Sequence, residues 1–362
     1  MKVLHILGSL HRGGAETMVM NLYRAFDKNL CQMDFIVHAE FENDYRDEAK
    51  KLGAQIILLP RPGKIGLFKY VITLKSAIKK HGYYDVIHIH TNYQAFLGVI
   101  AAKILGCRNI FVHSHTTSFS KIFLLVNRSI FKICKVKRVA CGIKAGISFF
   151  GKEKFFVINN AIDYRLFEPH KEQQKELKQQ FGFKNKKIIG HIGSFTYPKN
   201  HKFILDIANI LKKENKSVKI LLFGEGPLEE EIKKEVENFK LEEYIEFMGT
   251  TSEAYKMYRM FDIFILPSLY EGFPVTLVES QVEEIPTIVS DRITKECDFE
   301  EGLLNYLPLE AEKWVRKIEE IINGENKKIK KNFLKRENYD ISKQWKKLLK
   351  IYEGKNENSI FN

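Results

Sequence analysis

The sequence predicts an α/β protein made of two doubly wound parallel-sheet domains. Short apolar runs typical of buried strands alternate with amphipathic stretches typical of helices, and this alternation restarts near residue 187. Strands separated by helices form βαβ units and therefore a parallel sheet. A chain of 362 residues is also long for one ordinary domain. Two such domains facing each other create a cleft at the carboxyl ends of their strands, where these sheets bind ligands.

Each half contains its own set of expected elements. In the first half, we expect strands at residues 2–7, 33–37, 55–59, 86–90, 109–113 and 137–140, and helices at residues 16–25, 44–52, 69–81 and 95–105. In the second half, we expect strands at residues 187–192, 219–223, 244–247, 263–267 and 287–290, and helices at residues 202–213, 227–238 and 274–282. A polar linker with a surface helix is expected at residues 164–186. The expected domains are residues 1–165 and 166–335, and residues 336–362 are expected to form a helix that packs back on the first domain, with a frayed tail.

Composition narrows the function classes. The net charge is +13, and all of the excess lies in residues 1–168, with 25 basic and 12 acidic side chains, against 33 of each afterwards. A basic field of this size attracts nucleic acid, anionic lipid or a phosphorylated substrate. No apolar run reaches the roughly 18–20 residues that span a bilayer, and the first ten residues fit a strand better than a signal peptide. Five cysteines without a Cys-x-x-Cys pair argue against a disulfide framework and fit a reducing cytoplasm.

The strongest motif is the segment FILPSLYEGFPVTLVE at residues 264–279. A buried strand ends in a loop that carries Glu271, and Pro274 is expected in the first turn of the following helix. Glu271 and Glu279 can accept hydrogen bonds from sugar hydroxyls. The helix N-terminus between them is expected to present free N–H groups that form a site for phosphate, those of Val275, Thr276 and Leu277. A loop charge and an exposed helix residue would be the better explanation for two isolated glutamates, but the sixteen-residue context favours the binding site.

Three weaker motifs also follow expected strands. Residues 8–16 (GSLHRGGAE) allow close backbone approach to a ligand, although a tight turn is an equal alternative and the spacing is not that of a dinucleotide fingerprint. In residues 193–201 (GSFTYPKNH), Lys199 can pair with a phosphate or be a solvated loop lysine. In residues 224–227 (GEGP), the glycines indicate a structural turn whose backbone contacts the nucleotide base.

Histidines gather at the ends of the strands at 86–90 and 109–113. His115 can donate to a sugar oxygen or a phosphate, although a satisfied strand-end residue is the better explanation for either His113 or His115 taken alone. His88 and His90 alternate on a buried strand and are expected to be structural. These four histidines suggest a metal, but no cysteine or acidic ligand stands at a recognisable spacing, so no metal is expected.

The segment of residues 121–154 combines nine basic side chains with interleaved apolar ones and a single acid, Glu153. Such a basic amphipathic segment can lie on an anionic lipid leaflet. A core helix with a solvated basic face is an equally weighted alternative.

On these motifs the chain resembles the retaining nucleotide-sugar glycosyltransferases of family four, and is similar to bacterial capsular and exopolysaccharide glycosyltransferases. The matching segments are GGAE (13–16), the His115-Thr116 turn, NAID (160–163), GSFTYPKNH, GEGP and, most specifically, EGFPVTLVE (271–279). The resemblance implies the GT-B fold, in which two Rossmann-like domains, for acceptor and donor, face each other across a cleft. It implies catalytic roles for His115 and Glu271, and donor binding by Gly13, Gly14, Ser194, Lys199, Gly224, Glu225, Gly272, Phe273, Pro274, Val275, Thr276, Leu277 and Glu279.

One position departs from the family pattern. Ser194 stands where the family usually has arginine, and a hydroxyl cannot replace a bidentate guanidinium on a diphosphate. Weaker donor binding, recruitment of another cation such as Arg12, or reduced activity is therefore expected.

The expected reaction transfers a hexose or N-acetylhexosamine from a nucleotide diphosphate sugar, most simply a UDP-sugar, to a glycan or lipid-linked glycan with retention at the anomeric carbon. The resemblance implies no metal or other cofactor, and the basic half predicts peripheral binding to the anionic inner face of the cell membrane. The alternatives are a nucleotide-sugar epimerase of the same architecture and a nucleic-acid-binding protein. No recognisable nucleic-acid reader motif supports the latter, so no nucleic-acid partner is expected.

Overall fold

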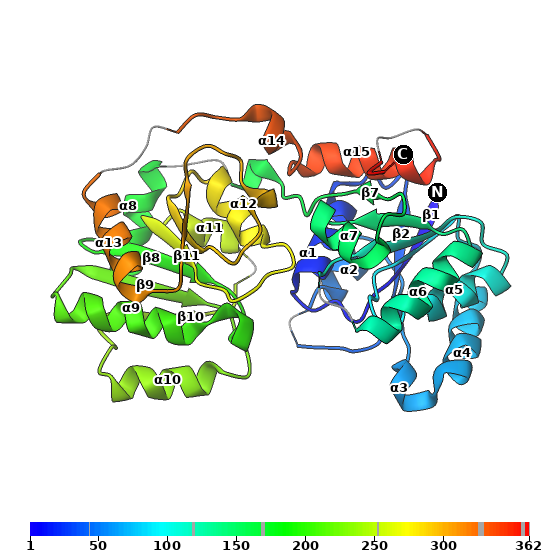
Figure 1. The fold of residues 1–362 in the computed structure, drawn as a ribbon, viewed down its shortest axis with the longest axis horizontal. Helices are drawn as coiled ribbons and strands as arrows, with labels where there is room; N and C mark the ends of the chain where they lie inside the picture. Colours follow the sequence, from blue (N-terminus) through cyan, green and yellow to red (C-terminus); the bar gives the residue numbers. More distant parts are fainter. Residues whose placement is uncertain are drawn as a thin grey trace. The chain divides into compact units, whose positions relative to one another are not determined.

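The chain divides into two compact units in the computed structural model (Figure 1). The structure describes residues 1–42, 44–117, 120–167, 171–251, 253–324, 329–355 and 359–361. Unit 1 consists of Met1–Ile162 together with Glu337–Asn362, and unit 2 consists of Asp163–Arg336. The divisions therefore lie after residues 162 and 336, beside the expected limits of 165 and 335, and the C-terminal segment belongs to the same unit as the N-terminus.

Unit 1 is built on a seven-stranded parallel sheet in the order β3-β2-β1-β4-β5-β6-β7. Its strands are β1 (Lys2–Ile6), β2 (Gln32–Val37), β3 (Ile56–Leu58), β4 (Val86–Ile89), β5 (Ile110–Ser114), β6 (Lys137–Ala140) and β7 (Phe156–Val157). Its helices are α1 (Gly14–Ala25), α2 (Arg46–Lys51), α3 (Pro62–Ile65), α4 (Leu67–Lys80), α5 (Ala95–Ile104), α6 (Lys121–Ile133), α7 (Ile143–Phe150) and α15 (Ile341–Tyr352).

The two faces of this sheet are covered by different helices because side chains alternate along each strand. In β1, Val3 packs into the core under α1 and α15, whereas Leu4 packs into the core under α4, α5 and α7. Helix α15 packs against α1 and places Leu348 and Tyr352 in the first of these cores. The apolar face of a C-terminal helix thus completes the domain formed by the N-terminal half.

Unit 2 contains a six-stranded parallel sheet in the order β10-β9-β8-β11-β12-β13. Its strands are β8 (Lys187–Ile192), β9 (Val218–Phe223), β10 (Ile245–Gly249), β11 (Ile263–Leu266), β12 (Thr287–Ser290) and β13 (Leu304–Leu307). Its helices are α8 (Lys171–Gln180), α9 (His201–Lys213), α10 (Glu229–Asn238), α11 (Ala254–Tyr258), α12 (Val275–Val282), α13 (Ala311–Ile322) and α14 (Phe333–Glu337), with short 3-10 turns at Tyr164–Leu166, Tyr197–Lys199 and Lys295–Cys297.

Both sheets reverse their strand order at one point. In unit 1 this point lies between β1 and β4, and in unit 2 between β8 and β11. Doubly wound sheets bind ligands in the crevice outside the carboxyl ends of the strands at such a point. The topology thus predicts ligand binding at the loops that follow β8 and β11, and at those that follow β1 and β4.

Candidate active site

The loops after β8 and β11 of unit 2 are hydrogen-bonded to each other. The side-chain amide of Asn200 donates a hydrogen bond to the carbonyl oxygen of Pro267 at 3.2 Å. The N–H of Leu269 donates to the carbonyl oxygen of Pro198 at 2.8 Å. Asn200 adopts the left-handed conformation that opens helix α9, which small polar side chains tolerate. These contacts hold the two loops at the switch point of the sheet.

Two of the predicted site residues meet across these loops. The ammonium nitrogen of Lys199 lies 2.7 Å from Oε1 of Glu271, and the hydroxyl of Ser268 donates to the same oxygen at 2.7 Å. The side chains of Lys199 and Glu271 are only 19% and 13% exposed. A solvated loop lysine and a free loop carboxylate are therefore the wrong interpretations of these two residues. Ser268, two residues after the end of β11, is a partner that the sequence motif did not predict.

The N-terminus of helix α12 lies just beyond Glu271 in the chain. The helix begins at Val275, and Pro274 is its N-cap, one residue outside the helix that the sequence predicts. Leu277 donates its N–H to the carbonyl oxygen of Pro274 at 3.1 Å, so the prediction that this amide is free for a phosphate is wrong. Among the described residues, none accepts a hydrogen bond from the N–H of Val275 or Thr276. These two amides remain available to an anion.

Glu279 lies on the same helix and is held by a buried tyrosine. The hydroxyl of Tyr258, at the end of α11, donates to Oε2 of Glu279 at 2.7 Å. Burial raises the pKa of Glu279 to about 7, because the charged form loses hydration, while the Tyr258 hydrogen bond acts in the opposite direction. An exposed helix carboxylate is therefore the wrong description. No signal in the sequence identified Tyr258, since only the fold brings it to Glu279.

The glycine-rich turn after β9 packs directly on the loop after β8. Gly224 has φ +138°, and a Cβ atom there would lie 2.2 Å from the carbonyl oxygen of Gly193. Phe195 donates its N–H to the carbonyl oxygen of Glu225 at 3.0 Å. The turn thus needs glycine for the close contact between the two loops. The side chains of Ser194 and Glu225 are exposed on these loops.

The glycine pair of unit 1 stands at the start of α1. Gly13 is the N-cap and Gly14 is the first helical residue. A Cβ atom at Gly14 would have no neighbour within 4 Å, whereas one at Gly13 would meet a carboxylate oxygen of Glu16 at 2.7 Å. The packing of unit 1 therefore does not itself require glycine at position 14, which leaves open space beside the helix N-terminus.

His115 follows β5 in unit 1 and is hydrogen-bonded to His90. Nε2 of His115 and Nδ1 of His90 are 2.8 Å apart. Nδ1 of His115 is buried without a hydrogen-bond partner among the described residues, so this ring is not a fully satisfied strand-end residue. Burial lowers the pKa of His115 to about 3, which keeps the imidazole neutral at physiological pH.

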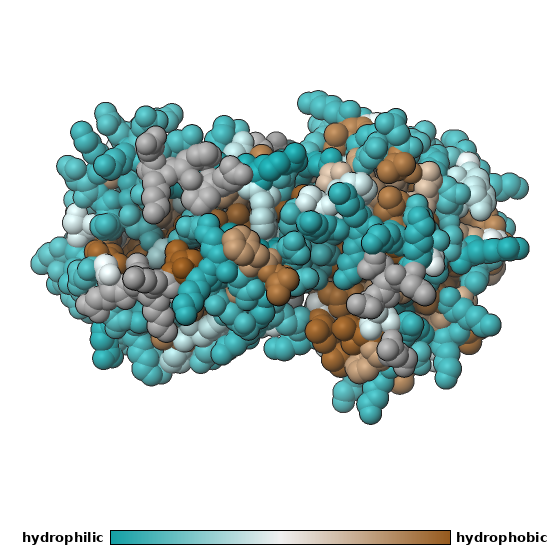
Figure 2. Space-filling view, turned by 90° about the horizontal axis from the view of Figure 1, so that it is seen from above, coloured by the Kyte–Doolittle hydropathy of each residue, from teal (hydrophilic) through white to brown (hydrophobic). Residues whose placement is uncertain are grey.

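The basic amphipathic segment contains helix α6, which is packed on one side only. Phe131 is fully buried in the core of unit 1, whereas Ile122, Leu125 and Ile133 are 74%, 68% and 75% exposed. Figure 2 shows apolar patches among the hydrophilic side chains on the face drawn. The helix therefore combines a core-facing side with apolar side chains open to solvent.

Among the described helices, none has both the length and the apolar character needed to cross a bilayer. All five cysteines are free thiols.

Both units of the chain match families of known proteins. Residues 173–337 match the family described as "Glycosyl transferases group 1", and residues 12–143 match "Glycosyltransferase Family 4". The putative glycosyltransferase EpsF of Bacillus subtilis is 37% identical over 321 residues, which cover 85% of this chain and 84% of the relative. The chain belongs to glycosyltransferase family 4. It is accordingly a transferase enzyme, as the resemblance implies.

Other relatives of this family 4 glycosyltransferase span its whole length. The capsular polysaccharide biosynthesis glycosyltransferase CapH of Staphylococcus aureus is 26% identical and covers 98% of this chain and 99% of the relative. The crystal structure of Anabaena Alr3699/HepE in complex with UDP-glucose superposes with a TM-score of 0.80 at 18% identity, covering 98% of this chain and 100% of the other. The predicted GT-B class, with two Rossmann-like parallel-sheet domains, is confirmed.

Proposed function

We propose that this glycosyltransferase moves a hexose or N-acetylhexosamine from a UDP-sugar to a glycan or lipid-linked glycan acceptor, with retention, in the synthesis of a bacterial surface polysaccharide. CapH supports the polysaccharide assignment by its name. An Escherichia coli relative named UDP-Gal:alpha-D-GlcNAc-diphosphoundecaprenol alpha-1,3-galactosyltransferase, 26% identical over 70% of this chain, supports a UDP-sugar donor and a lipid-linked acceptor.

The observation that carries the proposal is the Lys199–Glu271 pair beside the N-terminus of α12. Its 2.7 Å separation brings together a cation for a diphosphate and a carboxylate for sugar hydroxyls. The free amides of Val275 and Thr276 add donors for phosphate oxygens. In this proposal, Glu279 accepts hydrogen bonds from the ribose hydroxyls, while the loops of Gly224 and Ser194 carry backbone groups for the nucleotide.

The proposed transfer is a same-face displacement. The bond between the anomeric carbon and the diphosphate oxygen breaks, and the acceptor oxygen bonds to that carbon on the same face. The proton of the acceptor hydroxyl passes to the departing diphosphate oxygen. Glu271 positions the donor sugar, and the neutral imidazole of His115 contacts a sugar oxygen. Gly14 leaves room for the ligand.

Charge on the leaving diphosphate is stabilised by Lys199 and the helix amides, so the proposed transfer step needs no metal ion. These groups are part of the fold and need no reorganisation when the charge develops. Ser194 in place of arginine removes one cation from this set and lowers donor affinity.

The enzyme would work at the anionic inner face of the membrane. Helix α6 supports this part of the proposal, because its exposed Ile122, Leu125 and Ile133 stand within a strongly basic segment. Each basic side chain near an anionic surface contributes about 1 kcal/mol. A nucleic-acid partner is not part of the proposal.

Thermal unfolding with UDP, GDP and ADP tests the donor assignment. We expect UDP to raise the unfolding temperature of the wild type, and to raise it much less in Glu279→Ala. A rise in unfolding temperature with GDP or ADP alone would show that the donor nucleotide carries guanine or adenine and not uracil. Absence of any shift at saturating nucleotide would overturn the proposed site.

A further inference from the structure

Five imidazole rings gather on one face of the unit 1 sheet. His5 comes from β1, His88 from β4 with His90 directly after it, and His113 and His115 from β5 and its end. The parallel register places His5 opposite His88. Neighbouring rings have centroid distances between 4.1 Å for His113–His115 and 5.4 Å for His5–His88. The sequence prediction considered the last four and missed His5, which lies 83 residues before His88 in the chain.

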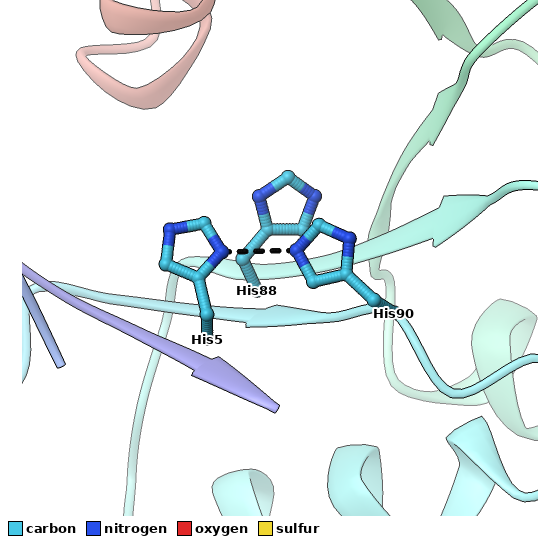
Figure 3. Close-up of side chains that lie close together, drawn as sticks. All are labelled: His5, His88 and His90. Atoms are coloured by element: carbon cyan, nitrogen blue, oxygen red, sulfur yellow. Dashed lines mark hydrogen bonds between the residues drawn. The ribbon is translucent and has the colours of Figure 1, made fainter. Parts of the chain in front are cut away.

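Three of these rings converge on each other (Figure 3). One nitrogen from each of His5, His88 and His90 lies within 4.8 Å of the other two. Nδ1 of His5 and Nε2 of His90 are 2.9 Å apart. All three side chains are buried, with 0%, 1% and 6% exposure.

Hydrogen bonds within the described part of the protein do not satisfy all the ring nitrogens of these three histidines. Nδ1 of His88 bonds the hydroxyl of Tyr352 at 2.5 Å, but Nε2 of His88 is buried with no partner among the described residues. Nε2 of His5 is also unpaired there, while its Nδ1 is the nitrogen that faces His90. A buried polar atom without a partner costs roughly 1–3 kcal/mol. Native proteins rarely leave such atoms unpaired, and an ion or a water molecule is the usual explanation.

The donor set is that of a zinc-class metal ion. Neutral imidazole nitrogens are ligands for such ions, and three histidines with an open fourth position are a known arrangement for zinc. Tetrahedral ligands at 2.0–2.1 Å from zinc stand about 3.3 Å from each other, so the 2.9 Å contact between His5 and His90 needs to open by only a few tenths of an ångström.

The second ring nitrogens support this assignment. A histidine ligand usually uses its other nitrogen to bond an outer group that orients the ring. His88 does so with Tyr352 of α15, and His90 does so with His115. A second triad, formed by His90, His113 and His115, shares His90, but His113 has no hydrogen-bond partner for either nitrogen among the described residues.

We propose that His5, His88 and His90 bind one divalent transition-metal ion of the zinc class inside unit 1. The ion would join β1 to β4 and, through Tyr352, help to hold the C-terminal helix. The ion takes no direct part in the proposed transfer step, which needs no metal, although its ligand His90 also bonds His115 of that step. It replaces the sequence-based expectation that the histidines bind none, since that expectation rested on the lack of an acidic or cysteine ligand.

The test uses the full chain, purified without a histidine tag and treated with a chelator. Wild type is titrated with Zn²⁺, and with Co²⁺ to record the visible absorption of a bound ion. We expect one equivalent of metal per chain, and an unfolding temperature raised by roughly 5–10 °C at a hundredfold excess over Kd. No binding by the wild type would overturn the inference.

Variants then locate the ion. His5→Asn and His88→Asn should each abolish the bound equivalent. His81→Asn, at a half-buried histidine of unit 1 whose ring bonds Gln55, should retain it. Loss in His113→Asn together with retention in His5→Asn would overturn the assignment in favour of the second triad. If the variants do not fold, X-ray absorption of the zinc-loaded wild type decides: three imidazole ligands are expected, and an oxygen-only set would contradict the site.

Discussion

The ammonium of Lys199 and the carboxylate of Glu271 form a 2.7 Å ion pair in which both side chains are largely shielded from solvent. Removing one partner of a shielded pair leaves the other charge without compensation, which costs more than the loss of an exposed ion pair. In the proposed function both charges also have ligands of their own, phosphate and sugar. The pair is therefore the most direct place to test the site.

Replacement of Lys199 by methionine should lower kcat/KM for sugar transfer by about 10²–10³, the range seen when one stabilising group is removed. The reason is loss of the cation that holds the leaving diphosphate. Lys184→Met, at an exposed lysine of the same unit, is the matched control and should keep wild-type kinetics. Steady-state assays with a UDP-sugar donor measure both. Equal kinetics for the two variants would remove Lys199 from the site.

Glu279 should make stability depend on pH. Its pKa is raised from 4.5 to about 7 in the folded protein, so the folded state binds the proton more tightly than the unfolded state. Stability contributed by the protonated carboxyl is complete below pH 4.5 and is lost as the pH rises to about 7. Glu279→Gln does not undergo this loss.

The unfolding temperatures of wild type and Glu279→Gln should therefore be compared at pH 5 and pH 8. We expect the variant to gain about 1–3 kcal/mol relative to wild type between these two values. Because other titrating groups are common to both proteins, the difference isolates this carboxyl. A difference that does not change with pH would contradict the raised pKa.

Gly14→Ala should separate stability from activity. The added methyl group meets nothing within 4 Å, and alanine is favoured over glycine inside a helix, so the unfolding temperature should be unchanged or slightly higher. Transfer should fall at least about tenfold if a ligand approaches this backbone closely, a loss of roughly 1.4 kcal/mol. Gly63→Ala in α3, which also has open space, should leave both properties unchanged. Full activity in Gly14→Ala would show that no ligand needs this space.

Gly224→Ala, unlike Gly14→Ala, should lower the unfolding temperature by destabilising unit 2. Its backbone has φ +138°, and the new Cβ would lie 2.2 Å from the carbonyl oxygen of Gly193. Strain and overlap together should cost about 2 kcal/mol or more. Thermal unfolding beside the Gly63→Ala control measures this. A variant as stable as wild type would mean that the two loops can separate without cost.

The double variant Ile122→Ser/Leu125→Ser should weaken binding to vesicles containing phosphatidylglycerol without lowering the unfolding temperature, because both side chains are mainly exposed. Phe68→Ser, at an 81% exposed residue of α4, is the control and should bind as wild type does. Co-sedimentation at low and at physiological salt measures the binding, which should weaken with salt. If the double variant sedimented with the vesicles as wild type does, α6 would not be a membrane-binding helix. Equal affinity of the wild type for duplex DNA would favour a general polyanion surface.

Much of the fold could be predicted because buried parallel strands consist of consecutive apolar residues. Strands β1, β2, β4, β5 and β6, and their counterparts in unit 2, appear close to the predicted positions. Strands β7 and β13 were missed: β7 has two residues, and all four residues of β13 are only partly buried. Asn305 interrupts the apolar pattern of β13, and the short apolar run at residues 155–158 places only two residues in β7.

The two-domain α/β class, the family motifs and the loops that carry them can be recognised from the amino-acid order, because hydrophobic periodicity and turn chemistry are local properties. Folding brings together groups that are distant in the chain. Lys199 and Glu271 are 72 residues apart, Tyr258 and Glu279 are 21 apart, and His5 and His90 are 85 apart. Which charges meet, and how far burial shifts the pKa of a carboxyl, depends on sheet order and on the exclusion of water, and neither is encoded in the spacing of neighbouring residues.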